Sequence, residues 1–139
     1  MTAHDVMTPN PATVTSRATV AEVWDLMREL EIRHVPIVDG GALVGMVSDR
    51  DLTQLDMGRI PALEGAEALR GPLSTPVVKL MTADVIVVNP DTELDEIVDL
   101  LIEHRIGAIP VVRTGTRDVV GIVSYIDVLE ALRDSLEGE

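Results

Sequence analysis

The sequence predicts an α/β (α+β) fold in which a strand–helix–strand–strand–helix unit occurs twice. Two observations carry this prediction. First, the 139-residue sequence matches itself after a shift of 74 positions, so that GMVSDRD at residues 45–51 returns, after a two-residue insertion, as GIVSYID at residues 121–127. Second, each copy alternates between the apolar period of strands and that of helices. The patterns predict repeat 1 at residues 1–54, a linker at 55–76 and repeat 2 at 77–139.

The composition narrows the class of protein. Hydrophobic residues make up 46% of the chain, with one Trp, one Tyr and no Phe, so the core must be aliphatic. The net charge of −13, with no basic cluster, argues against a nucleic-acid-binding surface. The absence of Cys excludes disulfides and thiolate nucleophiles. We find no signal peptide and no apolar run near the roughly 20 residues that span a bilayer, and we expect a cytoplasmic protein with no membrane partner.

Each repeat opens with a Met-Thr turn, a short strand and a helix. The strands are expected at residues 12–15 and 85–88. The helices are indicated by apolar side chains at helical spacing: Val20, Val23, Trp24, Met27 and Leu30 in repeat 1, and Leu94, Ile97, Val98 and Leu101 in repeat 2.

Candidate capping boxes precede both helices. Thr19 pairs with Glu22 in repeat 1, and Thr92 pairs with Asp95 in repeat 2. The two boxes lie one residue out of register between the copies, so we expect at least one of them to be wrong.

A β-hairpin and a second helix complete each repeat. The hairpin strands are expected at residues 35–38 with 43–47, and at 109–112 with 119–123. Gly40 and Gly41 form the first turn, and Gly115 lies in the second loop. The second helices begin after Ser48 and Ser124. Between the repeats, the Pro- and Gly-containing linker is expected at the surface, with a short helix at residues 63–69.

The duplicated Ser-x-x-Asp pattern has a structural and a functional interpretation. Ser48 with Asp51, and Ser124 with Asp127, fit capping boxes at helix starts, and a cap stabilises a helix by about 1 kcal/mol. A helix N-terminus is also an anion site, and an Asp carboxylate there can accept two hydrogen bonds from adjacent hydroxyls of a ribose. From the pattern alone, the cap is the favoured interpretation.

The order of motifs resembles a known family. The motifs are DVMT at 5–8, RHVPIVD at 33–39 and GMVSDRDL at 45–52, then KLMT at 79–82, GAIPVV at 107–112 and GIVSYIDV at 121–128. Together they resemble a tandem pair of cystathionine-β-synthase (CBS) domains, a Bateman module of the stand-alone bacterial type. The resemblance covers nearly all of the chain outside the linker.

The resemblance implies a fold and a function. It implies that the two repeats pack with pseudo-twofold symmetry through their sheets and form clefts that take adenosyl ligands: AMP, ADP, ATP, NAD or S-adenosylmethionine. It also implies a homodimer and a protein partner of unknown identity that responds to ligand occupancy. No resident cofactor is expected, because the adenine nucleotide would be a regulatory ligand, for example in energy sensing.

The resemblance also assigns residues. Asp51 and Asp127 match the ribose-binding acids, and Ser48 and Ser124 match the hydroxyl residues beside ribose or phosphate. The adenine-facing apolar positions are Val35, Ile109, Ala12 and Ile86. Arg33 and His34 match positions that contact phosphates. Arg50 fits either a phosphate contact or a solvated helix residue.

The two sites are expected to be unequal. Repeat 2 has Gly107, Ala108 and Ile126 where repeat 1 has its Arg, His and Arg, so the anion-binding side chains belong to repeat 1. The other histidines are expected to be structural, His104 at a helix C-terminus and His4 disordered or capping. No metal ligands stand at zinc spacing.

Two functions remain open, and a third is not expected. The first is a regulatory module that binds an adenosyl ligand and signals by a conformational shift. The alternative is a ligand-free structural or protein-interaction module, in which the Ser-x-x-Asp motifs are only caps. An enzyme is not expected, because each Ser has only an Asp on the same turn and no base to activate it.

Overall fold

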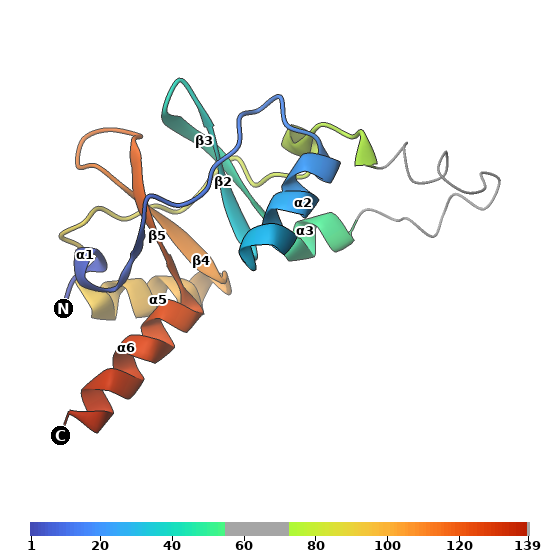
Figure 1. Ribbon diagram of the computed structural model, residues 1–139. Helices are drawn as coiled ribbons and strands as arrows, with labels where there is room; N and C mark the ends of the chain where they lie inside the picture. The colour runs from blue at the N-terminus through green and yellow to red at the C-terminus, as the bar shows by residue number, and fades with distance from the viewer. Residues whose placement is uncertain (55–72, 139) are drawn as a thin grey trace. The chain divides into compact units, whose positions relative to one another are not determined.

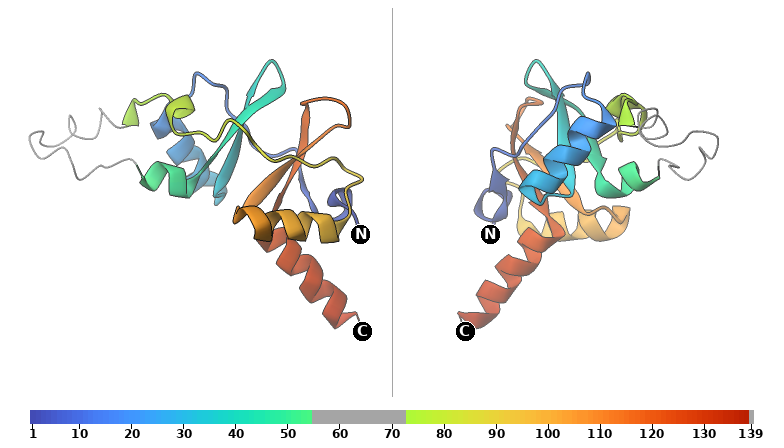
Figure 2. Two further views of the ribbon diagram at one scale, coloured as in Figure 1. Left: turned by 180° about the vertical axis from the view of Figure 1, so that it is seen from behind. Right: turned by 45° about the vertical axis from the view of Figure 1, so that its right-hand side comes forward.

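A computed structural model of the chain describes residues 1–54 and 73–138 (Figure 1, Figure 2). Its first part holds α1 (Ala3–Val6), β1 (Thr8–Pro9), α2 (Val20–Leu30), β2 (His34–Asp39), β3 (Ala42–Ser48) and α3 (Asp49–Thr53). Its second part holds the 3₁₀ helix η2 (Val77–Lys79), α5 (Leu94–His104), β4 (Ala108–Val112), β5 (Val119–Ser124) and α6 (Tyr125–Glu137). The mixture of helices and strands confirms the predicted α+β class. The helix expected at residues 63–69 lies outside the described residues.

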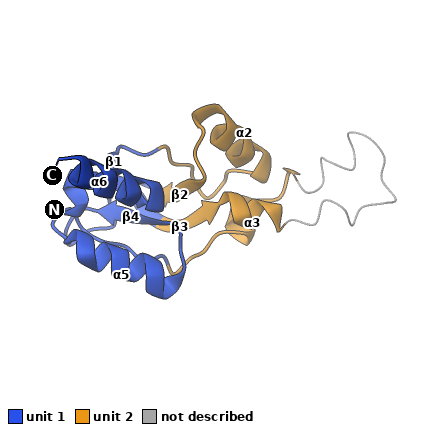
Figure 3. Cartoon of the chain, turned by 90° about the horizontal axis from the view of Figure 1, so that it is seen from below, with its two compact units in different colours: residues 1–11, 40–43, 85–139 blue, residues 12–39, 44–84 orange. Residues whose placement is uncertain are grey.

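The chain forms two compact units that are not contiguous in sequence (Figure 3). Unit 1 contains residues 1–11, 40–43 and 85–139. Unit 2 contains residues 12–39 and 44–84. The start of the chain therefore belongs to the same unit as the body of repeat 2.

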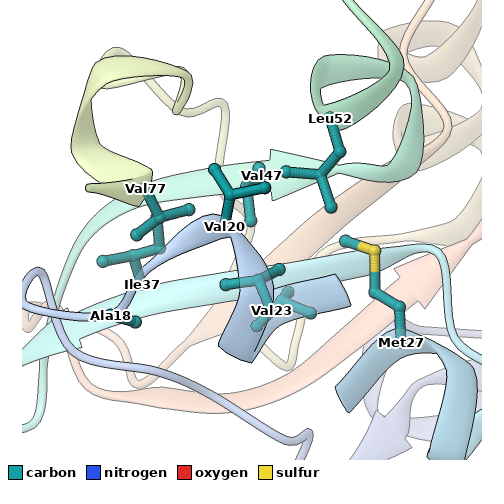
Figure 4. Close-up of a cluster of buried hydrophobic side chains, with 9 residues drawn as sticks. Ala18, Val20, Val23, Met27, Ile37, Val47, Leu52 and Val77 are labelled. Carbon is teal, nitrogen blue, oxygen red and sulfur yellow. The ribbon is translucent and has the colours of Figure 1, made fainter. Parts of the chain in front are cut away.

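Unit 2 contains a two-stranded sheet, β2 with β3, and the helices α2 and α3. Its core is aliphatic, as the composition predicted (Figure 4): Ala18, Val20, Val23, Met27, Val35, Ile37, Val47, Leu52 and Val77. The apolar stripe predicted for α2 is confirmed at its buried positions. Trp24 and Leu30 depart from it, because 38% and 51% of their surfaces are exposed.

Unit 1 contains a three-stranded antiparallel sheet in the order β1-β5-β4, with α1, α5 and α6. Its core consists of Ala3, Val88, Ile97, Leu101, Ile109, Val111 and Val123. The predicted hairpin is confirmed, with Ile109 opposite Val123. Helix α6 buries none of its residues, and its C-terminal half extends away from the rest of unit 1 (Figure 2).

The strands predicted at residues 12–15 and 85–88 shrink to single bridges, and this is a correction. Val14 pairs in parallel with Ile37, and Val88 pairs in parallel with Val111. Continuing the first ladder toward the N-terminus would require an N–H from residue 36, which is a proline. Proline also stands at position 110 of the second ladder, so neither ladder continues toward the N-terminus.

The capping of the first helices differs between the copies. Thr19 caps α2, because its side-chain oxygen accepts the Glu22 N–H at 3.3 Å. The box predicted at Thr92 is wrong: the residue before α5 is Glu93, which makes no side-chain cap bond. Thr92 instead accepts the Asn89 N–H at 3.1 Å, so a local turn has taken its hydroxyl.

The structure tests the expectations for His104 and His4. His104 ends α5, as expected. His4 lies inside α1, and the cap of that helix is a box formed by Thr2 and Asp5, so the disordered or capping role expected for His4 is wrong.

The opening Met-Thr turn of each repeat packs on a glycine of the other repeat. In unit 1, Met7 covers Gly121, and Thr8 pairs with Ile122. In unit 2, Met81 covers Gly45. A Cβ on Gly121 would stand 2.9 Å from Met7 Cγ, and one on Gly45 would stand 3.0 Å from the Thr82 carbonyl oxygen. The repeated glycine therefore allows a close approach that any side chain would block.

Candidate functional site

The Ser-x-x-Asp pattern of unit 2 forms the predicted capping box. Ser48 is the N-cap of α3 and lies at the end of β3. Its N–H donates to Asp51 Oδ2 at 2.8 Å, and the Asp51 N–H donates to Ser48 Oγ at 3.2 Å. Both side chains are half-buried. The box fixes the carboxylate of Asp51 beside the first turn of the helix.

The pattern of unit 1 forms the same box with more hydrogen bonds. The N–H and Oγ of Ser124 donate to Asp127 Oδ2 at 2.8 and 3.1 Å. The Asp127 N–H donates back to Ser124 Oγ at 3.2 Å. The other carboxylate oxygen, Oδ1, accepts from Thr8 Oγ1 at 3.4 Å. Asp127 is thus held from α6, from the end of β5 and from β1.

Thr8 is the residue that sequence reasoning missed in this site. The signal was present, because Met-Thr opens both repeats at Met7 and Met81. By itself, the motif predicts only a turn at the start of each repeat. Only the pairing of β1 with β5 brings it to the acid of the other repeat.

His34 and Arg33 lie beside the box of unit 2. The Asp49 N–H donates to the Arg33 carbonyl oxygen at 2.9 Å, which joins the start of β2 to the start of α3. Burial lowers the pKa of the His34 imidazole below its ordinary value, because burial penalises the charged ring. The carboxylates of Asp49 and Asp51 oppose this lowering, and Arg33 adds to it. The His34 imidazole therefore lies within electrostatic range of Asp49, Asp51 and Arg33.

The remaining predicted contacts differ in exposure. Val35 and Ile109 are fully buried, each in the hydrophobic core of its unit. Ala12 and Ile86 are half-buried on the segments that precede the single bridges. Arg50 is exposed on the first turn of α3, where both of its alternatives remain open. The adenine-facing roles of the four apolar residues stay predictions.

Each box holds a carboxylate at a helix start, where it can accept hydrogen bonds from the hydroxyls of a ligand. A carboxylate has two oxygens and about four lone-pair positions, so it can bind two neighbouring hydroxyls at once. Each Ser hydroxyl accepts the N–H of the Asp on its own turn, and the hydroxyl of Ser124 also donates to the carboxylate of Asp127. This arrangement suits recognition of a ligand with vicinal hydroxyls.

Sequence comparisons place the chain among known proteins. The sequence profile described as CBS domain matches residues 3–58 and 77–134. The CBS domain-containing protein YhcV of Bacillus subtilis (strain 168) is 32% identical over 123 residues, which cover 88% of this chain and 79% of that protein. The profile matches both repeats that the sequence predicted.

Structural comparisons give the same result. The CBS domain pair of protein MJ0100, solved with 5′-methylthioadenosine and S-adenosyl-L-methionine, is 27% identical, with a TM-score of 0.79 over 97% of this chain and 98% of that chain. The structure of CBSX2 in complex with AMP is 29% identical, with a TM-score of 0.78 over 96% of both chains.

Proposed function

The chain belongs to the CBS domain family, and from that membership we propose that it is a regulatory module that binds an adenosyl ligand. AMP, ADP and ATP are the first candidates, and NAD and S-adenosylmethionine are further ones. Ligand binding shifts the population between two arrangements of the chain, and a protein partner responds to that shift. The proposal includes no covalent step.

The observation that carries the proposal is the pair of Ser-x-x-Asp boxes. Each box orients a carboxylate that can accept hydrogen bonds from the ribose hydroxyls of an adenosyl group. The complexes of similar CBS domain pairs with AMP and with S-adenosylmethionine support this ligand class.

The other predicted residues supply the remaining contacts in this proposal. Arg33, His34 and Arg50 bind the phosphates, since a guanidinium can donate to phosphate oxygens through two parallel hydrogen bonds. The adenine ring packs on the half-buried side chains of Ala12 and Ile86, whereas Val35 and Ile109 are fully buried and offer it no exposed surface. The arginines and the histidine belong to repeat 1. Ligands with phosphates and ligands without them should therefore differ in which of the two acids they bind more tightly.

Isothermal titration calorimetry tests the proposal. The purified chain is titrated with AMP, ADP, ATP, NAD and S-adenosylmethionine, and the variants Asp51→Ala and Asp127→Ala are titrated in parallel. We expect binding of at least one ligand and its loss, or a weakening of tenfold or more, in one of the two variants. A folded chain that binds none of them at millimolar concentration would refute the proposal.

Asp5→Ala is the matched control for the loss of a cap. Asp5 accepts the Thr2 N–H at 2.8 Å, as Asp51 and Asp127 accept the N–H of their own serines, and it is not among the residues of the proposed site. This variant should lose some stability and keep its ligand affinity. If it lost ligand affinity as well, the effect of the other two Asp variants would be assigned to destabilised helices.

A second candidate function, a protein-interaction module, is favoured by the exposed face of α6. Tyr125, Leu129, Leu132 and Leu136 follow one another at spacings of four, three and four residues, and 41%, 53%, 53% and 64% of their surfaces are exposed. This spacing suits packing against another helix, and the homodimer that we propose would cover it. Leu132→Glu should shift a dimer to monomer in light scattering; an unchanged mass would remove α6 from the interface.

A further inference from the structure

Thr8 makes a contact with Asp127 that has no described counterpart in the other copy. Its hydroxyl donates to Asp127 Oδ1 at 3.4 Å. Thr82 holds the matching position, because it pairs with Met46 as Thr8 pairs with Ile122. Among residues 1–54 and 73–138, no hydrogen bond joins Thr82 to Asp51.

The position of Thr8 is fixed by the backbone. Strand β1 pairs with β5, with Pro9 opposite Gly121, and Met7 covers that glycine. On the C-terminal side of Thr8, the Asn10 N–H donates to the Val120 carbonyl oxygen at 3.2 Å. The hydroxyl of Thr8 is therefore held beside Asp127 by the packing on both sides of it.

The two acids differ in their remaining capacity to accept hydrogen bonds. From the residues that the structure describes, Asp127 accepts three hydrogen bonds, two from Ser124 and one from Thr8. Within the described residues, Asp51 accepts one, from the Ser48 N–H. A carboxylate has about four acceptor positions, so a vicinal diol that donates two hydrogen bonds finds enough at Asp51 and too few at Asp127.

We propose that Thr8 sets the specificity of the Asp127 site by occupying the acceptor position that a ribose diol would use. This inference rests on the proposed function and refines it. A ribose ligand must displace the hydroxyl of Thr8 before both of its hydroxyls can bind Asp127. The Asp127 site therefore binds ribose ligands more weakly than its carboxylate would otherwise allow, and the start of the chain determines this difference.

The test isolates one acid at a time and uses AMP as the probe. In an Asp51→Ala background only the Asp127 site remains, and Thr8→Val removes the hydroxyl while keeping the shape of the side chain. Calorimetry should show AMP binding about tenfold tighter in the double variant than in Asp51→Ala alone, the gain expected for one freed hydrogen bond to a charged group. With 2′,3′-dideoxy-AMP, which has no ribose diol, Thr8→Val should change nothing.

Thr82→Val in an Asp127→Ala background is the matched control and should leave AMP affinity within about twofold. An AMP affinity that Thr8→Val leaves unchanged or weakens would overturn the inference alone. An equal gain from both Thr variants, or a gain with the dideoxy ligand, would overturn it as well. If the unmodified chain bound no adenosyl ligand, the proposed function and the affinity claim would both fail.

A ligand-free measurement separates the contact from its consequence. Urea unfolding of Thr8→Val, Asp127→Asn and their combination forms a double-mutant cycle. We expect the two changes to be non-additive, and the cycle of Thr82→Val with Asp51→Asn to be additive. An additive Thr8–Asp127 cycle would mean that the two side chains do not interact. It would overturn the inference whatever the ligand titrations show.

Discussion

At the residue scale, His34 combines partial burial with nearby acids. Its pKa is lowered in the folded chain, chiefly by burial, while Asp49 and Asp51 oppose the shift. The unfolded chain takes up a proton near the ordinary value of 6.5, and the folded chain does so only at lower pH. Between these two values the unfolded state binds more protons, so the stability falls as the pH falls.

His34→Gln should remove this contribution. The free energy of unfolding of the unmodified chain, measured in urea, should decrease as the pH drops from about 7.5 through the window just below 6.5. The variant should show a smaller decrease across the same window. Equal pH slopes in the two proteins would mean that His34 titrates alike in the folded and unfolded states.

At the element scale, the helices that follow the first bridges begin differently. Helix α2 has a hydroxyl cap from Thr19, whereas α5 starts after Glu93 without a side-chain cap. Both end with a residue in the left-handed region, Glu31 at φ 54° and Arg105 at φ 52°. The corresponding helices α2 and α5 therefore end in the same conformation and begin with different caps.

Thr19→Ala should destabilise the chain by about 1 kcal/mol, because the Glu22 N–H loses its acceptor at the helix start. Thr19→Ser keeps a hydroxyl and should recover most of the loss. The midpoint of urea unfolding measures both changes. If Thr19→Ser were as unstable as Thr19→Ala, the methyl group rather than the cap would account for the effect.

At the scale of the whole molecule, each compact unit depends on a segment from the other sequence repeat. Unit 1 contains residues 1–11, whose Ala3 is fully buried and whose Met7 covers Gly121. In unit 2, the Thr82 N–H donates to the Met46 carbonyl oxygen at 2.8 Å, beside Gly45. The opening segment of each repeat thus packs in the unit formed mainly by the other repeat. A division of the chain into two contiguous domains would place each opening segment in the wrong unit.

Alanine at either glycine should destabilise the chain by about 1–3 kcal/mol, the usual cost of overpacking. Gly45→Ala should cost more, because its Cβ would meet the Thr82 carbonyl oxygen at 3.0 Å, whereas at Gly121 the nearest atoms belong to the side chain of Met7. Met7→Ala should then offset much of the cost of Gly121→Ala in a urea double-mutant cycle. Met81→Ala should offset less of the cost of Gly45→Ala, and the reverse order would contradict the packing.

Over the described residues, no helix is long and apolar enough to cross a membrane. The predicted cytoplasmic location, the homodimer, and the residue roles carried over from the family stay predictions.

The sequence by itself determined the features that depend on neighbours along the chain. The duplicated Gly-apolar-Val-Ser-x-x-Asp pattern predicted two strands that end in capping boxes, and both boxes formed with the predicted residues. The helical stripe of α2 and the hairpins were predictable for the same reason, because their signals lie within about ten residues.

Only the tertiary structure decided which distant segments meet. It paired Thr8 with Ile122, which brought a hydroxyl to Asp127, and it packed Met81 on Gly45. It also ended the first ladder on its N-terminal side, because the missing N–H of Pro36 matters only once its partner strand is known. A local pattern carries no information about the register between segments that are distant in the sequence, and packing of the folded chain supplies it.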